Sequence, residues 1–295
     1  MVPAAPAVRV TATPRFWTIL LRSRLVTAAI VILALVVLVA ALADLLAPYS
    51  PAAQAGAQRL QGPSAAHLLG TDDLGRDTLS RVIFGTRVAL TASLLAVSVA
   101  LLLGLPLGVL SGYWSGLVDD VLMRLMDGMF AFPPIVLALT IVSVLGPNLV
   151  NAMLAIGIVN APRVARLVRA QMLGIRQEEF VLAARCLGAS HARLMWRHVF
   201  PGTLAPLVVQ TSLSMGFALL AEASLSFLGL GVQPPTPSWG SMLRSAARYL
   251  EVDPWMAVGP GVAILFTILA FNLLGDGLRD AFDPRTRTRA QGHVS

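Results

Sequence analysis

Long apolar stretches alternate with short polar segments rich in glycine or proline along nearly the whole chain. A helix that crosses a bilayer needs about 20 apolar residues, because only a helix or a closed barrel satisfies its own backbone hydrogen bonds there. We predict one span for each stretch that meets this length: 25–46, 88–118, 121–145, 149–168, 204–228 and 255–275. The pattern therefore predicts an all-α, polytopic membrane protein with about six transmembrane helices.

The polar segment 47–87 separates the first two spans and has its own pattern near its end. Apolar residues follow a roughly helical spacing among charged ones at Leu74, Leu79, Val82 and Ile83. Such spacing is typical of an amphipathic helix that lies in the membrane interface. We predict an interfacial helix here, and the alternative is an ordinary exposed loop with a few buried contacts.

Arginine supplies all the basic charge and sets the predicted orientation. The chain has 22 basic residues and none of them is lysine, which leaves a formal net charge of +7. With the N-terminus inside, fifteen arginines fall in inside segments and six in outside segments, with Arg124 at a helix end. Because positive residues favour the cytoplasmic side, both termini and the arginine-rich stretch 163–197 are predicted to be cytoplasmic.

Composition narrows the class of protein further. Apolar residues make up 56% and charged residues only 13%, whereas a soluble domain is typically about 25% charged. Without lysine the chain has neither the P-loop Lys that reaches nucleotide phosphates nor a Schiff-base amine. The single cysteine, Cys186, excludes an intrachain disulfide and a CxxC site, and we expect it to be a small packing residue. The arginines flank apolar segments instead of forming one stripe, so we expect no nucleic-acid partner.

The stretch between the fourth and fifth spans has the pattern of two short helices joined by a turn. Glu178 and Glu179 stand where a first helix would begin, and carboxylates suit that positive end of the helix dipole. Gly188 then allows a turn, and a second, basic helix is expected to end at Pro201. Two interpretations remain open on these grounds: a rigid element that docks a soluble partner, or a basic interfacial hairpin that only sets topology.

The spacing of small residues in this stretch resembles the "EAA" signature of importer-type ABC permeases. Ala183-Ala184 is followed by three residues, Gly188, nine residues and, shortly after, Pro201. Leu182 departs from the signature, which has Glu there; Glu179, one helical turn earlier, is the candidate for the acidic contact. Two further stretches, 67–90 and 222–240, are similar to the second, C-type permease of the dipeptide, oligopeptide and nickel uptake group. The resemblance extends from about residue 15 to residue 284.

The resemblance implies the type I ABC importer permease fold. It also implies a second related permease as a heterodimeric partner, two cytoplasmic ATP-binding subunits, an extracytoplasmic substrate-binding protein and surrounding membrane lipid. The chain would then be a subunit of the cell membrane that is not itself an enzyme and binds no cofactor, with ATP and Mg used by the partners. The implied substrate is a dipeptide or oligopeptide, with nickel as the alternative. The implied docking residues are Glu178, Glu179, Ala183, Ala184, Gly188, Ala189 and Pro201.

These interpretations divide the chain into five segments. They are a cytoplasmic segment 1–24, the first span 25–46, an extracytoplasmic segment 47–87 with the interfacial helix, a permease core 88–278 that holds five spans and the coupling loop 169–203, and a cytoplasmic tail 279–295.

Two acidic residues lie inside apolar stretches. A carboxylate within a membrane span suggests a functional role, which makes Glu222 and Asp127 candidates for lining a transport path. Each lies near a predicted span end, where a polar side chain also reaches headgroups or a backbone donor. His191 and His198 share one helix face but have no neighbouring ligand at metal-site spacing, and we interpret them as polar surface residues.

Two other functional classes remain as alternatives. A stand-alone secondary transporter would need internal symmetry and ionisable groups or broken helices near mid-membrane, and it leaves the long basic loop unexplained. A membrane-embedded enzyme would need a nucleophile and base, or clustered metal ligands, within its spans, and the sequence shows none.

Overall fold

The computed structural model describes Leu20 and residues 23–282, and regular structure in this part of the chain is helical. The predicted terminal segments 1–24 and 279–295 lie almost wholly outside the described residues. The elements are α2 (Arg24–Ala41), α3 (Ala43–Leu46), the 3₁₀ turn η1 (Gly56–Gln58), α4 (Thr78–Tyr113), α5 (Leu117–Phe130), α6 (Pro134–Leu145), α7 (Leu149–Ile175), α8 (Glu179–Cys186), α9 (His191–Arg193), the π-helical turn η2 (Leu194–Val199), α10 (Phe200–Phe227), α11 (Trp239–Arg248) and α12 (Trp255–Phe282).

Four helices in the described part are long and apolar enough to cross a membrane: α2, α4, the continuous stretch His191–Phe227, and α12. They coincide with the first, second, fifth and sixth predicted spans, with shifted ends. Helix α7 covers the fourth prediction but runs past residue 168 to Ile175 and carries three arginines, so it is less apolar than the other four.

The third predicted span, 121–145, is wrong as a single straight helix. The chain forms α5 and α6 instead, and the two are bent by 91° at the break between them. Pro133, directly before Pro134, has extended backbone angles of φ −54° and ψ 130°. A residue that precedes proline disfavours the helical conformation, and proline itself suits the first turn of the new helix. The proline pair therefore ends one helix and begins another.

The separate interfacial helix predicted before the second span is also wrong. Leu74 lies in a turn, whereas Leu79, Val82 and Ile83 are helical but belong to α4, which runs without a break from Thr78 to Tyr113. Asp77 begins the helix by accepting a hydrogen bond from the Ser80 backbone N–H at 2.7 Å. Since no proline stands between Asp77 and Pro106, every residue in this stretch can continue the helical hydrogen bonds, and the first part of the helix stays in line with the span.

The most extensive helix contact joins α4 to α7 through small residues on α4. Gly104, Gly108 and Gly112 follow one another at four-residue intervals, which places them on one face of α4, and each lies close to the α7 backbone. A Cβ at Gly104 would lie 2.5 Å from the Ala161 carbonyl oxygen. Small residues at such a contact let two membrane helices approach closely enough for van der Waals packing to hold them together.

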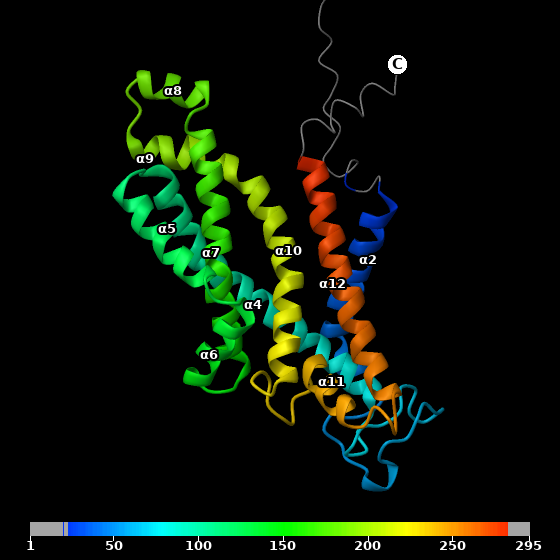
Figure 1. The fold of residues 1–295 in the computed structure, drawn as a ribbon. Helices are drawn as coiled ribbons and strands as arrows, with labels where there is room; N and C mark the ends of the chain where they lie inside the picture. Colours follow the sequence, from blue (N-terminus) through cyan, green and yellow to red (C-terminus); the bar gives the residue numbers. More distant parts are fainter. Residues whose placement is uncertain (1–19, 21–22, 283–295) are drawn as a thin grey trace, which may run out of the picture.

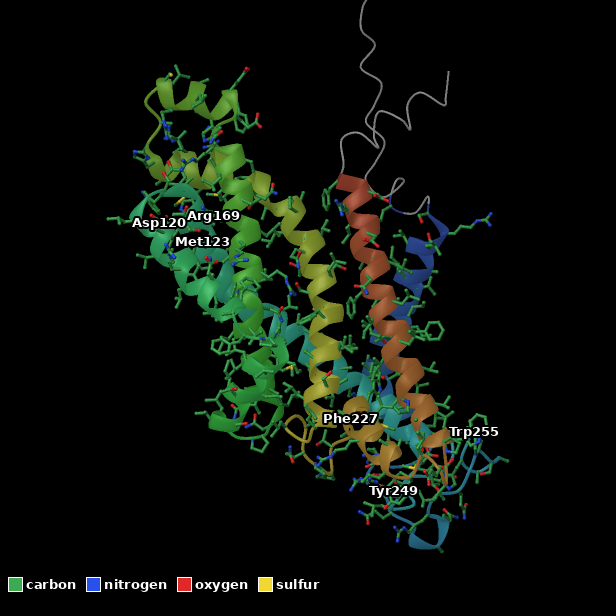
Figure 2. The ribbon with its side chains drawn as sticks, viewed as in Figure 1. Asp120, Met123, Arg169, Phe227, Tyr249 and Trp255 are labelled. Carbon is green, nitrogen blue, oxygen red and sulfur yellow. The ribbon has the colours of Figure 1, made fainter. Side chains whose placement is uncertain are left out.

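The ends of the bundle differ in what they carry. Figure 1 shows α8 and α9 at one end, together with the start of α2 and the end of α12, whereas α11 and the segment 47–77 lie at the other. Figure 2 places Asp120 and Arg169 towards the α8 end, and Phe227, Tyr249 and Trp255 at the opposite end. Aromatic residues at a helix end match the interfacial belts of membrane proteins.

Candidate functional site

The central part of the predicted coupling loop 169–203, residues 176–201, projects from one end of the bundle as a helical hairpin, and the name refers to these residues from here on (Figure 1). Its first helix, α8, begins directly after Glu178, whose backbone is extended, and carries Glu179 in its first turn. The sequence predicted this start. Both carboxylates are exposed, and they interact favourably with the positive end of the helix dipole.

The turn after α8 has the hydrogen bonds of a Schellman motif. The Ala189 N–H donates to the Ala184 carbonyl at 3.1 Å, and the Gly188 N–H donates to the Arg185 carbonyl at 3.0 Å. Gly188 has φ +81°, and a Cβ there would find nothing within 4 Å. Glycine is therefore favoured by the left-handed backbone conformation and not by a lack of space.

Pro201 does not end the second helix of the loop, contrary to the prediction. The chain remains helical from α9 through η2 into α10, and Pro201 stands in the first turn of α10. Proline lacks an N–H and crowds the carbonyl four residues before it. The wider π-helical turn Leu194–Val199 ends two residues before Pro201, so the carbonyl that proline crowds lies within this irregular turn and not within a regular α-helix.

The inner face of the coupling loop is packed into the bundle. Val181, Leu194 and Val199 are buried and join a core cluster with Val168 and Met172 of α7. These contacts make the loop a rigid extension of the helices on either side of it, because a close-packed interior transmits displacement.

Polar contacts add a second connection, from the loop to the end of α4. The Arg176 guanidinium donates to the Tyr113 carbonyl at 3.0 Å. The Tyr113 hydroxyl lies 3.0 Å from Nδ1 of His191. Sequence reasoning missed Tyr113 and Arg176, because the residues they join are distant in the chain and no local pattern signals the contact.

The outer face of α8 is apolar and exposed. Phe180 is 53% exposed, Leu182 45% and Leu187 89%. Ala183 is also exposed, and Cys186, which the sequence predicted to pack, lies exposed on the same helix. Exposed apolar side chains on a short projecting helix suit contact with a partner protein or with the membrane interface, so the geometry alone leaves both interpretations of this loop open.

Two ion pairs tie α5 to α7 near the same end. Arg169 donates to both carboxylate oxygens of Asp119, at 2.5 and 2.6 Å. Arg166 pairs with Asp127, whose side chain is 58% exposed. Asp127 thus lies against a cation on the neighbouring helix, and its predicted role in lining a transport path stays a prediction.

Glu222 is buried near the end of α10, with only 2% of the residue exposed. It accepts a hydrogen bond from the Ser226 hydroxyl at 2.6 Å, and the same hydroxyl oxygen accepts one from the Val232 N–H at 3.3 Å. These bonds connect the carboxylate to the loop that follows α10. The geometry gives Glu222 a part in holding that loop, and its pathway role also stays a prediction.

A groove of about 370 Å³ opens between α6, α7 and α10. Its lining is almost wholly apolar and includes Ile135, Ile156, Val159 and Leu220, with Asn160 and Ser224 as the polar side chains. Neither Glu222 nor Asp127 lines it. Within residues 23–282, no group of three or more His, Cys, Asp and Glu side chains could hold a metal ion.

The fold and the coupling loop together define a polytopic membrane transport subunit. Comparison with protein families gives the more particular assignment. Residues 104–288 match the family described as the binding-protein-dependent transport system inner membrane component. Residues 13–63 match the N-terminal transmembrane domain of oligopeptide transport permease C. The chain belongs to the family of inner membrane components of binding-protein-dependent transport systems.

Individual relatives are similar over nearly their whole length. The dipeptide transport system permease protein DppC of Alkalihalophilus pseudofirmus is 43% identical over 90% of this chain and 88% of its own. The di/tripeptide transport system permease protein DppC of Pseudomonas aeruginosa is 44% identical over 93% of each chain. The glutathione transport system permease protein GsiD of Pectobacterium atrosepticum is 43% identical over 92% of this chain and 91% of its own.

These findings confirm the resemblance identified in the sequence. The protein is a multi-pass inner membrane permease subunit of an ABC importer. The alternative of a stand-alone secondary transporter gains no support from them.

Proposed function

We propose that this subunit imports small peptides as half of a heterodimer with a second, related permease. The observation that carries the proposal is identity of 43–44%, over nine-tenths of the chain, to relatives named for dipeptide, di/tripeptide and glutathione transport. Nickel, the other substrate that the sequence left open, has no counterpart in those three names. An extracytoplasmic binding protein would deliver the peptide.

The ATP chemistry belongs to two cytoplasmic ATPase subunits that use ATP and Mg. The absence of lysine from all 22 basic residues supports this division of labour, because a P-loop site needs its Lys. The docking surface is the exposed outer face of α8 and the turn after it. Of the residues that the signature indicates, Glu178, Glu179, Ala183 and Gly188 are exposed there. Ala184 and Ala189 pack against the core cluster beneath this surface, and Pro201 lies in the first turn of α10.

Movement at this surface reaches the membrane helices through two kinds of contact. The buried face of the loop packs on α7, and the contacts of Tyr113 with Arg176 and His191 join it to α4. Closure of the ATPases would therefore displace α4, α7 and α10 together. The apolar groove between α6, α7 and α10 supplies one wall of the path, and the second permease would cover its open side.

The complete assembly in proteoliposomes tests the proposal. With binding protein, both permeases and ATPases, we expect uptake of radiolabelled Ala-Ala that requires ATP and Mg. Labelled nickel offered in the same vesicles should not accumulate. ATP-independent uptake by this chain alone, driven by a proton or sodium gradient, would contradict the proposal and support a secondary transporter.

A further inference from the structure

A pocket rich in arginine lies at the end of the bundle opposite α8. It has a volume of about 110 Å³ and is formed by the start of α4, the loop 229–236 and α11. Four of the six arginines that the sequence places outside line it: Arg76, Arg81, Arg244 and Arg248. Among the described residues no carboxylate lines the pocket. These arginines run against the positive-inside rule, so they call for a reason other than orientation.

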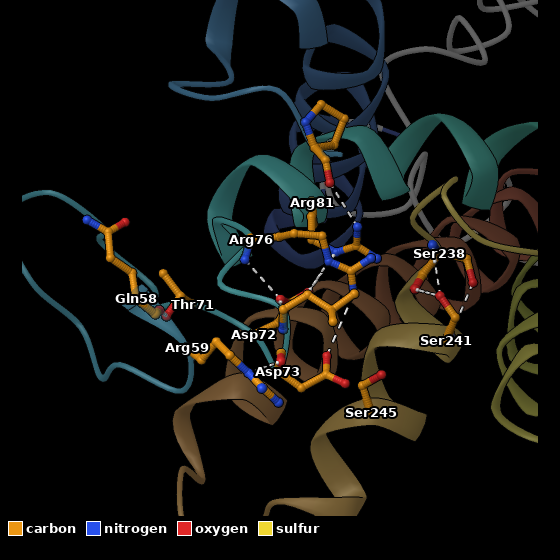
Figure 3. A network of polar contacts seen from close by, with 12 residues as sticks. Gln58, Arg59, Thr71, Asp72, Asp73, Arg76, Arg81, Ser238, Ser241 and Ser245 are labelled. Atoms are coloured by element: carbon orange, nitrogen blue, oxygen red, sulfur yellow. Dashed lines mark hydrogen bonds and ion pairs between the residues drawn. The ribbon is translucent and has the colours of Figure 1, made fainter. Parts of the chain in front are cut away.

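Two of the four arginines are already paired. Asp72 lies 2.6 Å from Arg76 Nε and 3.4 Å from Arg81 Nε, as Figure 3 shows. Asp73 lies 3.7 Å from Arg76. This acidic pair balances the charge of Arg76 and Arg81, and the short contacts fix both guanidinium groups in the pocket wall.

The other two arginines carry charge that is not balanced. Within residues 23–282, Arg244 and Arg248 form no ion pair, and both are exposed. Arg248 has one long contact, 3.5 Å, to the Ser245 hydroxyl. The pocket as a whole is therefore positive and accessible, which attracts an anion.

The position of Arg244 is set by the loop that faces it. A Cβ at Gly229 would collide with Arg244 Nη1, so the guanidinium occupies the space that a side chain there would fill. Gly229 has φ +88°, which also favours glycine. Ser241 and Ser245 of α11 add neutral hydroxyls to the same pocket.

The chemistry of the pocket suits a carboxylate. A guanidinium presents parallel N–H donors that match the two oxygens of a carboxylate, and hydroxyls add further donors. The volume holds a carboxylate and the atoms next to it, while the rest of a larger ligand would extend through the open side. Every peptide with a free C-terminus carries such a group.

We propose that the pocket of Arg244 and Arg248 binds the C-terminal carboxylate of a peptide as it enters from the extracytoplasmic side. The inference rests on the proposed function, which makes α8 cytoplasmic and the opposite end the entrance. It adds a binding site on this chain that orients the peptide before it reaches the groove.

Equilibrium binding to the permease–ATPase assembly in lipid nanodiscs, without binding protein, tests the site. The probes are Ala-Ala and its C-terminal amide, and saturation-transfer NMR measures the binding of each. We expect Ala-Ala to bind weakly and saturably, and the amide to bind about tenfold more weakly. R244Q or R248Q should weaken the binding of Ala-Ala by a similar factor. R59Q is the matched control: Arg59 is exposed at the same end and contacts the Asp73 carbonyl, but it does not line the pocket.

Three results would overturn the site. Equal binding of acid and amide, unchanged binding by both pocket variants, or an equal loss in R59Q would each show that the pocket does not recognise the carboxylate. Loss of Ala-Ala binding when phosphatidylglycerol replaces phosphatidylcholine would assign the pocket to lipid phosphate instead. ATP-driven uptake by the wild type is measured in parallel, so failure of peptide transport itself is distinguished from failure of the site.

Discussion

The hydroxyl of Tyr113, at the end of α4, lies 3.0 Å from Nδ1 of His191 in the second half of the coupling loop. The two residues are 78 positions apart in the chain. Helix α4 is the longest uninterrupted α-helix in the described part of the chain. The contact joins it directly to the coupling loop, which is proposed to receive the ATPase. It is a polar link by which movement of that element reaches the membrane.

Tyr113→Phe removes the hydroxyl and keeps the packing of the ring. We expect the protein to assemble normally, because one such hydrogen bond contributes only about 1 kcal/mol to stability. Peptide transported per ATP hydrolysed should fall, since the loop would move with less effect on α4. Tyr249→Phe, at the opposite end (Figure 2), is the control and should leave the ratio unchanged. Equal ratios in wild type and Tyr113→Phe would remove this contact from the coupling path.

Gly188 and Gly174 make a matched pair, because a Cβ at either position finds nothing within 4 Å. In Gly188→Val the β-branched valine would have to adopt φ near +81°. This conformation costs about 1–3 kcal/mol of folding free energy and distorts the turn. We expect uptake to be lost while the protein remains in the membrane. Gly174→Ala lies inside α7 and should be neutral or slightly stabilising. Normal uptake and normal ATPase association in Gly188→Val would contradict the role of this turn.

Close packing of α4 on α7 predicts a large effect at Gly108. An alanine Cβ there would lie 2.6 Å from the Ala165 carbonyl oxygen, so the two helices must separate. We expect Gly108→Ala to lower stability by about 1–3 kcal/mol, measured as a lower thermal unfolding midpoint in detergent. Gly128→Ala is the control, since a Cβ at Gly128 meets nothing within 4 Å. Equal midpoints for the two variants would show that the helices are not in such close contact.

Asp119 and Asp120 are adjacent on α5 but differ in their partners. Asp119 is buried and accepts two hydrogen bonds from Arg169, whereas Asp120 is exposed. Asp119→Asn should destabilise the protein by about 1.5–3 kcal/mol, because charge-assisted bonds are lost and Arg169 keeps its charge. Asp120→Asn should lower the stability much less. The thermal unfolding midpoints of the two variants are compared to test this. A larger loss in Asp120→Asn would contradict the ion pair.

The local features of the fold could be predicted from the sequence because they depend on neighbouring residues. Apolar runs located the spans, Glu178 and Glu179 located the start of α8, and Gly188 located the turn after it. Predictions failed where one local signal was given too much weight. Pro201 was expected to end a helix, but the π-helical turn before it lets the helix continue.

The contacts of the site were beyond prediction for a different reason. The pairing of Tyr113 with His191 depends on how α4 meets α9, and that of Asp119 with Arg169 depends on how α5 packs on α7. The arginine pocket likewise combines residues around 80 and around 245. In the sequence these arginines are notable only because fewer arginines are predicted outside than inside. No local pattern indicates that they lie close together.

Site-specific crosslinking at Leu187 determines whether the coupling loop contacts an ATPase subunit. Leu187 is 89% exposed on the coupling loop, and Leu45 is 81% exposed at the other end of the bundle. In a Cys186→Ala background, each is replaced by cysteine and treated with a short bifunctional crosslinker in membranes that contain the whole assembly. We expect a crosslink between Leu187→Cys and an ATPase subunit, and none from Leu45→Cys. Absence of the Leu187→Cys product in an assembly that transports peptide, or an equal product from Leu45→Cys, would contradict this expectation.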